Sequence, residues 1–340
     1  MAGWRRTVAI NVAVFVFLVL LAEGSARVLI YFLRGTSTHG IRERTLYLRY
    51  RPYVMYGADF DVTMAAERLR DGAPEGTYRV LLVGGSTAQL FPPRVLEKAF
   101  SDRYPGRRFQ VINGGYGRWE SRQELVQVSI WGTPLEPDLI ISLDGVNDLD
   151  ARMDVDKPGT FVLDSAYRFY LNHPFLAPLN YLLSQSQAFN GILRVMKIYQ
   201  VGPVQDYVDT VPVYIAAEHG INVIARGLGA ARLMVLQPFM AFKSPLSPQE
   251  AKYTAYKYRE TVMKQLLVLA DQQLRQLADR DHVLYLNTNP IYDGILDTLF
   301  SDAFHFTDDK GYEVMAKAIV GAIDARSMEG RRRASTGTGS

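Results

Sequence analysis

Short apolar runs alternate with amphipathic stretches between about Tyr78 and Ala325. The runs are rich in valine, isoleucine and leucine and end in glycine or polar residues, which is typical of buried strands. Predicted strands cover residues 79–83, 109–112, 138–143, 233–236 and 283–286. Predicted helices cover residues 94–104, 120–131, 308–325 and a stretch running to residue 278 behind a capping-box pattern of Ser247 and Glu250. This alternation predicts an α/β fold, a three-layer α/β/α sandwich with a central, mostly parallel five-stranded sheet.

The remaining segments break this rhythm and define the predicted domain organisation. Residues 35–77 mix Gly, Thr, Arg and Tyr without long periodicity, and we interpret them as a linker and lead-in. Residues from about 151 to 230 are rich in Tyr, Phe, Leu and Pro, which indicates an insertion with short helices inside the domain at 78–325. The end of the chain, 326–340, has the composition of a disordered tail.

The first 34 residues have the pattern of a membrane segment. Arg5 and Arg6 precede an apolar run over 8–21, and apolar residues resume at 28–33. As a helix, the first run is about 21 Å long, which is shorter than the ~30 Å hydrocarbon core of a bilayer. Together the two runs predict an amino-terminal transmembrane helix, and the basic start favours a cytoplasmic amino terminus. The domain would then lie on the extracytoplasmic side of a single-pass anchor.

The polar patch between these two runs leaves a second interpretation open. Gly24 and Ala26 are small residues at the spacing that a signal peptidase requires, so the segment is also compatible with a cleaved secretory signal. We favour the uncleaved anchor because the apolar pattern resumes and because Glu23 and Arg27 can pair across one helical turn.

Composition excludes several classes of site. The chain has no cysteine, which rules out disulfides, thiol nucleophiles and cysteine metal ligands. The net charge is +3, from 38 basic and 35 acidic residues, and three of the arginines lie together at 331–333. The rest of the chain is therefore close to neutral and shows no basic face of the kind that binds nucleic acid. No His, Asp and Glu spacing predicts a metal site, and a P-loop lysine is missing after Gly85, so we expect no cofactor.

Polar residues gather where the predicted strands end. The first strand is followed by Ser86, the second by Gly114 and Gly115, and the third by Asn147. A later loop carries the sequence Ser-Asp-Ala-Phe-His at 301–305. Because ligands bind at the carboxyl ends of parallel strands, we expect these loops to meet at one edge of the sheet.

These residue types match the chemistry of acyl transfer. A serine hydroxyl such as Ser86 needs a base to take its proton, and the imidazole of His305 can serve as that base. Asp302, three residues earlier, can bind the second ring nitrogen and orient the ring. Backbone N–H groups next to glycines and the Asn147 amide can stabilise an oxyanion. Each motif alone is also common in ordinary turns, and their conjunction favours an active site.

The order and spacing of these motifs resemble the SGNH/GDSL hydrolase superfamily. Its blocks are Gly-Asp-Ser, Asn-x-Gly, Gly-x-Asn-Asp and Asp-x-x-His, and this chain has their counterparts at 84–86, 113–115, 145–148 and 302–305. The resemblance implies the flavodoxin-like SGNH fold, with Ser86 as nucleophile, His305 as general base and Asp302 as its orienting acid. It also implies an oxyanion hole formed by the Ser86 and Gly115 N–H groups and the Asn147 side chain, although Gly114 competes with Gly115.

This chain departs from the family pattern at Gly85, where the family has an acidic residue that is not the catalytic acid. The leading functional prediction is a serine esterase that removes an acyl group, in the simplest case acetyl, from a small molecule or cell-envelope glycan. One alternative is an O-acyltransferase that acylates a polysaccharide with the same residues. Another is a catalytically idle SGNH-like subunit for binding or assembly.

Overall fold

The computed structural model describes residues 2–34, 49–51, 54–57, 72–150, 186, 188, 205, 208–253 and 257–324. The chain divides into two compact units, one of residues 1–50 and 163–200 and the other of residues 51–162 and 201–340. The two short strands β1 (Arg49–Arg51) and β2 (Met55–Gly57) lie in the predicted lead-in. The predicted tail and most of the predicted insertion lie outside the described residues.

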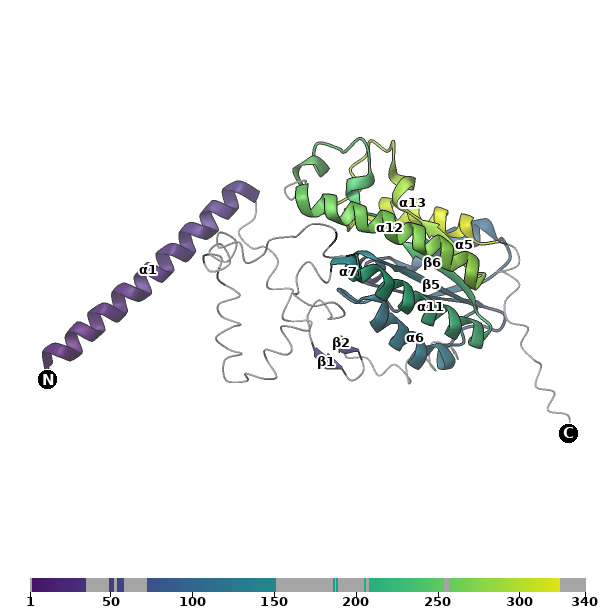
Figure 1. Cartoon of the computed structure of the whole chain (residues 1–340), viewed down its shortest axis with the longest axis horizontal. Coiled ribbons are helices and arrows are strands. Elements are labelled where there is room, and N and C mark those ends of the chain that lie inside the picture. Colours follow the sequence, from purple (N-terminus) through teal and green to yellow (C-terminus); the bar gives the residue numbers. More distant parts are fainter. Residues whose placement is uncertain are drawn as a thin grey trace. The chain divides into compact units, whose positions relative to one another are not determined.

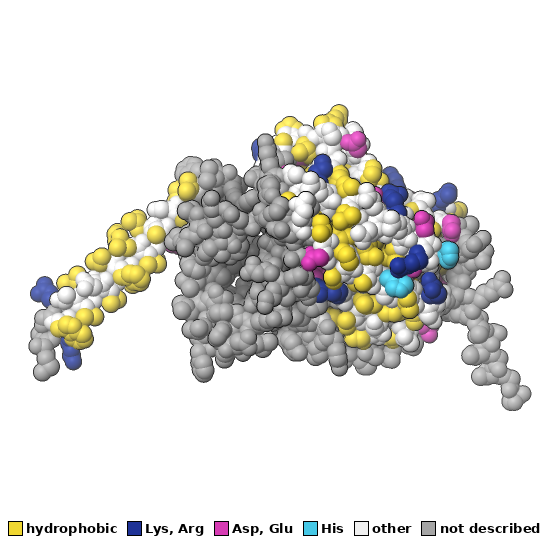
Figure 2. Space-filling model, viewed as in Figure 1, with side chains coloured by type: hydrophobic (Ala, Val, Ile, Leu, Met, Phe, Trp, Pro, Cys, Tyr) yellow, Lys and Arg dark blue, Asp and Glu magenta, His cyan; other side chains and the backbone are white. Residues whose placement is uncertain are grey.

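The described part of the first unit contains the long helix α1 (Ala2–Arg34), whose apolar stretch Trp4–Leu29 spans 26 residues and includes an 18-residue segment with a mean hydropathy of 2.2. By length and composition this helix can cross a membrane. Figure 2 shows apolar side chains along its length and basic side chains near its amino end. The predicted pair inside the polar patch is confirmed, because Arg27 Nε donates to Glu23 Oε1 at 2.7 Å. Ser186 Oγ and the Ala188 N–H also donate to Glu23, at 2.8 and 3.1 Å.

The second unit is built on a parallel five-stranded sheet with strand order β4-β3-β5-β6-β7. The strands are β3 (Tyr78–Gly84), β4 (Phe109–Asn113), β5 (Leu139–Asp144), β6 (Ala231–Leu236) and β7 (Leu284–Asn287). Every residue of the central strands β3 and β5 is buried, as expected for a sheet that is covered on both faces. The predicted fold class and all five predicted strands are confirmed.

Helices cover both faces of this sheet (Figure 1). One core joins β3 side chains such as Val80 and Leu82 to α5 (Pro93–Arg103) and α13 (Asp309–Ala322). On the opposite face, Leu81 and Ile140 pack against α6 (Ser121–Leu135) and α11 (Thr210–Leu228). The long helix α12 (Lys257–Asp281) packs beside α11 over β6. The result is the predicted three-layer sandwich.

The carboxyl-terminal end of the predicted insertion differs from the structure. The predicted insertion ended near residue 230, but Thr210–Leu228 form α11, a 19-residue helix of the covering layer. Its buried face includes the polar residues Glu218 and Asn222, which interrupt the apolar pattern. Ser247 and Glu250 exchange the predicted capping-box bonds at the start of the short 3₁₀ helix η4 (Glu250–Tyr253), and the described part of the long helix α12 covers Lys257–Asp281.

Short elements follow the carboxyl ends of the strands. They are α4 (Ser86–Gln89) after β3, α7 (Val146–Asp150) after β5, η3 (Met240–Phe242) after β6 and η5 (Asn289–Tyr292) after β7. The candidate active-site residues lie on or next to these elements.

Candidate active site

Ser86 is the first residue of α4, directly after β3 and a pair of glycines. Gly84 has φ +151°, and a Cβ there would lie 2.3 Å from the Leu143 carbonyl oxygen. A Cβ on Gly85 would lie 2.3 Å from Asn147 Nδ2. Both glycines therefore allow a close approach of the serine turn to the third strand and its loop. At Gly85 the Asn147 amide occupies the space that a Cβ would need.

The structure brings Ser86, His305 and Asp302 together. Ser86 Oγ lies 2.7 Å from His305 Nε2, and His305 Nδ1 lies 2.7 Å from Asp302 Oδ2. The Ser86 and His305 positions are 219 residues apart in the chain, so only the fold can produce this contact. Ser86 and His305 are both half-buried.

The Asp302 carboxylate is fixed on both oxygens. Oδ1 accepts the backbone N–H groups of Phe304 at 2.8 Å and His305 at 2.9 Å, while Oδ2 faces the imidazole. Burial alone would raise the pKa of Asp302, but these hydrogen bonds and the charge of His305 outweigh it and hold the pKa below its usual value. The carboxylate therefore stays ionised and can orient the imidazole.

Asn147 lies on α7 and is positioned by a residue of another loop. Its Nδ2 donates to the Trp119 carbonyl oxygen at 2.8 Å, which uses one of the two amide hydrogens. The next residue, Asp148, accepts both the N–H and the hydroxyl of Ser121, the first residue of α6. Burial raises the pKa of Asp148 to about 6, although the Ser121 bonds oppose this shift. These contacts hold Asn147 next to Gly85 and the serine turn.

The second motif is tied to the serine turn through Asn113. Asn113 Nδ2 donates to the carbonyl oxygens of Ala88 at 2.7 Å and Phe91 at 2.9 Å. Its Oδ1 accepts the Gly115 N–H at 2.8 Å, and the Gly114 N–H donates to Leu82 O at 2.7 Å. The N–H groups of both competing glycines are therefore engaged. A Cβ on Gly115 would lie 2.4 Å from the Gln89 backbone nitrogen, so packing against α4 also explains this glycine.

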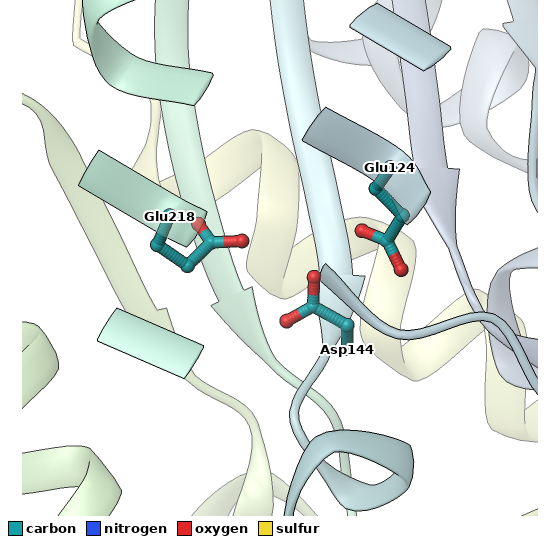
Figure 3. Close-up of side chains that lie close together, drawn as sticks. All are labelled: Glu124, Asp144 and Glu218. Carbon is teal, nitrogen blue, oxygen red and sulfur yellow. The ribbon is translucent and has the colours of Figure 1, made fainter. Parts of the chain in front are cut away.

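Three carboxylates that sequence spacing did not group meet below the end of β5. Oxygens of Glu124, Asp144 and Glu218 lie within 4.8 Å of one another, and all three side chains are buried (Figure 3). Glu218 pairs with the buried Arg232, and Tyr214 OH donates to Asp144 at 2.6 Å. Within the described residues, no amide, guanidinium or alcohol group donates to either oxygen of Glu124 or to Asp144 Oδ2.

This carboxylate cluster has ligands that could hold a cation, but protons can also satisfy it. Burial, followed by the neighbouring carboxylates, raises the pKa of Asp144 well above its usual value, and burial does the same for Glu124. A carboxyl group that keeps its proton can donate to a neighbouring carboxylate. The sequence signal was absent because the three acids come from three separate elements, α6, β5 and α11.

Comparisons with known proteins give matches only among solved structures. No family model matches the chain, and no curated protein matches it either. The acetylxylan esterase Axe2 from Geobacillus stearothermophilus matches at 16% identity and a TM-score of 0.44, covering 75% of this chain and 97% of that one. LAE5, an alpha/beta hydrolase enzyme from the metagenome of Lake Arreo, matches at 16% identity and a TM-score of 0.41, covering 72% and 94%.

Proposed function

We propose that this protein is a serine hydrolase of carboxylic esters that works through an acyl-enzyme. The observation that carries the proposal is the 2.7 Å contact between Ser86 Oγ and His305 Nε2, with Asp302 on the other ring nitrogen. Nucleophile, base and orienting acid thus stand in hydrogen-bond reach of one another, which is the geometry that activates a serine.

In the acylation step, Ser86 Oγ attacks the ester carbonyl carbon while His305 Nε2 accepts the hydroxyl proton. The tetrahedral intermediate collapses, the bond to the alkoxy oxygen breaks, and His305 returns the proton to the leaving alcohol. Asp302 stays ionised throughout and stabilises the imidazolium. In deacylation, His305 takes a proton from water, the resulting hydroxide attacks the acyl carbon, and Ser86 leaves with that proton.

We assign the oxyanion to two donors, the Ser86 N–H and the Asn147 side-chain amide. The first N–H groups of a helix have no partner within the helix, and Ser86 begins α4. Asn147 retains one amide hydrogen after its bond to Trp119. Gly115, the third predicted donor, would serve only after its N–H leaves Asn113 Oδ1.

For the substrate, we propose a small acyl ester on a cell-envelope glycan. The support is α1, whose apolar stretch is long enough to cross a membrane and whose amino end carries Arg5 and Arg6. These features favour a single-pass anchor with the hydrolase domain on the extracytoplasmic side. Esterases that act on acetylated xylooligosaccharides occur among the matching structures, and such a substrate belongs to the same chemical class.

The test is fluorophosphonate labelling of the full chain in detergent, with turnover of a chromogenic acetyl ester. Labelling and turnover should disappear in Ser86→Ala and His305→Ala. Ser129→Ala is the matched control, because Ser129 is an exposed serine of α6 whose hydroxyl donates to the Leu125 carbonyl oxygen of the same helix. A folded wild-type chain that is not labelled would refute the hydrolase proposal and favour a binding subunit. Turnover that requires an added sugar acceptor would instead indicate acyl transfer.

A further inference from the structure

The loop that carries Asp302 and His305 is a small hairpin with a closed base. Phe300 and Phe306 form an antiparallel bridge, and the Thr307 N–H donates to the Leu299 carbonyl oxygen at 2.8 Å. Within the hairpin, the Ser301 N–H donates to the His305 carbonyl oxygen at 2.8 Å. The imidazole can therefore reach Ser86 only if the whole hairpin is held at the correct place.

The incoming side of this hairpin is bound by a residue nearly fifty positions earlier in the chain. Glu250 Oε1 accepts the backbone N–H groups of Leu299 at 2.9 Å and Phe300 at 3.1 Å. Its Oε2 accepts the Ser247 N–H at 2.8 Å and the ammonium group of Lys243. Glu250 is fully buried, so each of these bonds is shielded from water.

Lys243 extends the same network to the segment just before the hairpin. Its Nζ donates to the Asp297 carbonyl oxygen at 3.0 Å, and its side chain is 1% exposed. Burial alone would raise the pKa of Glu250, but the bonds from Lys243 and from the three backbone N–H groups lower it to about 2. The carboxylate is therefore charged at every pH at which the protein would work.

We propose that Glu250 is a positioning residue for catalysis, fixing the hairpin so that His305 Nε2 stays within hydrogen-bond distance of Ser86 Oγ. The inference rests on the proposed hydrolase function. Four donors converge on one carboxylate, and a neutral side chain cannot accept from all of them. In a glutamine at this position, the amide NH₂ must face either the hairpin N–H groups or Lys243, and either orientation sets donor against donor.

A second set of contacts joins the hairpin to the segment that Lys243 terminates. The Met240 N–H donates to the Ala303 carbonyl oxygen at 2.9 Å, and Phe304 stacks on the buried Phe239 at a centroid distance of 5.6 Å. Since Lys243 ends this segment and also binds Glu250, the two supports of the hairpin share one ion pair. Loosening the ion pair should therefore move Asp302 and His305 together, without separating them from each other.

The test compares Glu250→Gln with Glu97→Gln. Glu97 Oε1 also accepts a backbone N–H, that of Val111 at 2.9 Å, but on α5 away from the hairpin. We expect Glu250→Gln to lower kcat for the acetyl ester and the fluorophosphonate labelling rate about tenfold or more per folded molecule, equivalent to about 1.4 kcal/mol of barrier. KM should change little, because Glu250 is fully buried and a substrate cannot reach it. Glu97→Gln should leave both rates within about twofold of wild type.

Thr298→Val provides a milder variant in case Glu250→Gln does not fold. Thr298 Oγ1 donates to Ser247 Oγ at 2.7 Å and links the hairpin base to the same capping box. Its removal should lower kcat a few-fold at unchanged KM. The inference would be overturned if Glu250→Gln folds and keeps the wild-type kcat. If Glu250→Gln does not fold, a folded Thr298→Val with the wild-type kcat would overturn it. Labelling of the wild-type protein distinguishes these results from a failure of the hydrolase proposal. If that proposal is wrong, neither the wild-type protein nor any variant would be labelled.

Discussion

Gly85 permits a sharp test of the oxyanion assignment. Its φ is −77°, outside the left-handed region that favours glycine, so φ does not by itself exclude an alanine at this position. The new Cβ would lie 2.3 Å from Asn147 Nδ2. The amide must therefore move by more than about 1 Å to reach an ordinary contact of ~3.5 Å. A displacement of this size removes a hydrogen bond to the oxyanion. Gly85→Ala should thus have the same effect as Asn147→Ala.

The expected magnitude follows from the loss of one oxyanion donor, about 3 kcal/mol of transition-state stabilisation, or roughly 10²-fold in kcat. The double variant should also lose only about 10²-fold, because the second substitution has no donor left to remove. The assay is kcat for a chromogenic acetyl ester in the four members of the cycle. Gly227→Ala is the control, since a Cβ there meets nothing within 4 Å. If the double variant instead loses about 10⁴-fold in kcat, the product of the two single losses, the two substitutions act independently. That result would refute the proposal that Gly85→Ala acts by displacing the Asn147 amide from the oxyanion.

Three further predictions concern charge and the amino terminus. Asp302→Asn should lower kcat by about 10⁴-fold without unfolding the protein, as measured by ester turnover and circular dichroism, because the amide favours the wrong imidazole tautomer. Burial raises the pKa of Glu124, so its contribution to stability is full below the usual carboxyl pKa and is lost as pH rises from there through the folded-state pKa; Glu124→Gln should flatten this fall of Tm with rising pH. Dependence of that Tm on a chelator would instead indicate a bound cation. Mass spectrometry of the membrane-extracted protein should find residues 2–34 present, and a chain starting near residue 27 would show that the segment is a cleaved signal.

The strands were predictable because each is a run of mainly apolar residues, as expected for a strand that is buried on both faces. Each run is also followed by glycine or polar residues. Burial of all of β3 and β5 leaves no amphipathic ambiguity, and even the positions of Ser86 and Asn147 after those strands follow from local sequence. Helix α11 was not predictable in this way. Glu218 and Asn222 are polar but buried, because they pair with Arg232 from β6, and a pattern of exposed polar positions cannot reveal such a contact.

Contacts between distant segments account for the rest of what the sequence concealed. The Ser247 and Glu250 capping box was visible locally, but the same carboxylate also binds Leu299 and Phe300, a pairing with no spacing signature. The motif predicts the Gly115 N–H as an oxyanion donor, but it does not predict that Asn113 Oδ1 accepts this N–H in the structure. Hydrogen-bond partners of single backbone groups depend on side-chain orientation, which a motif does not specify.

The candidate site therefore combines local and distant supports of unequal strength. Ser86 is placed by the turn between β3 and α4, whereas Asn147 depends on Trp119, and His305 depends on a hairpin bound by Glu250. A contact with a distant segment requires more of the chain to be ordered than a local turn does, at a larger cost in conformational entropy. Such contacts are therefore the part of a site that local fluctuations loosen most easily. Substitutions of the supports should accordingly lower kcat through geometry while the serine remains in place. Partial loss of labelling rate with full final labelling would be the signature of this behaviour.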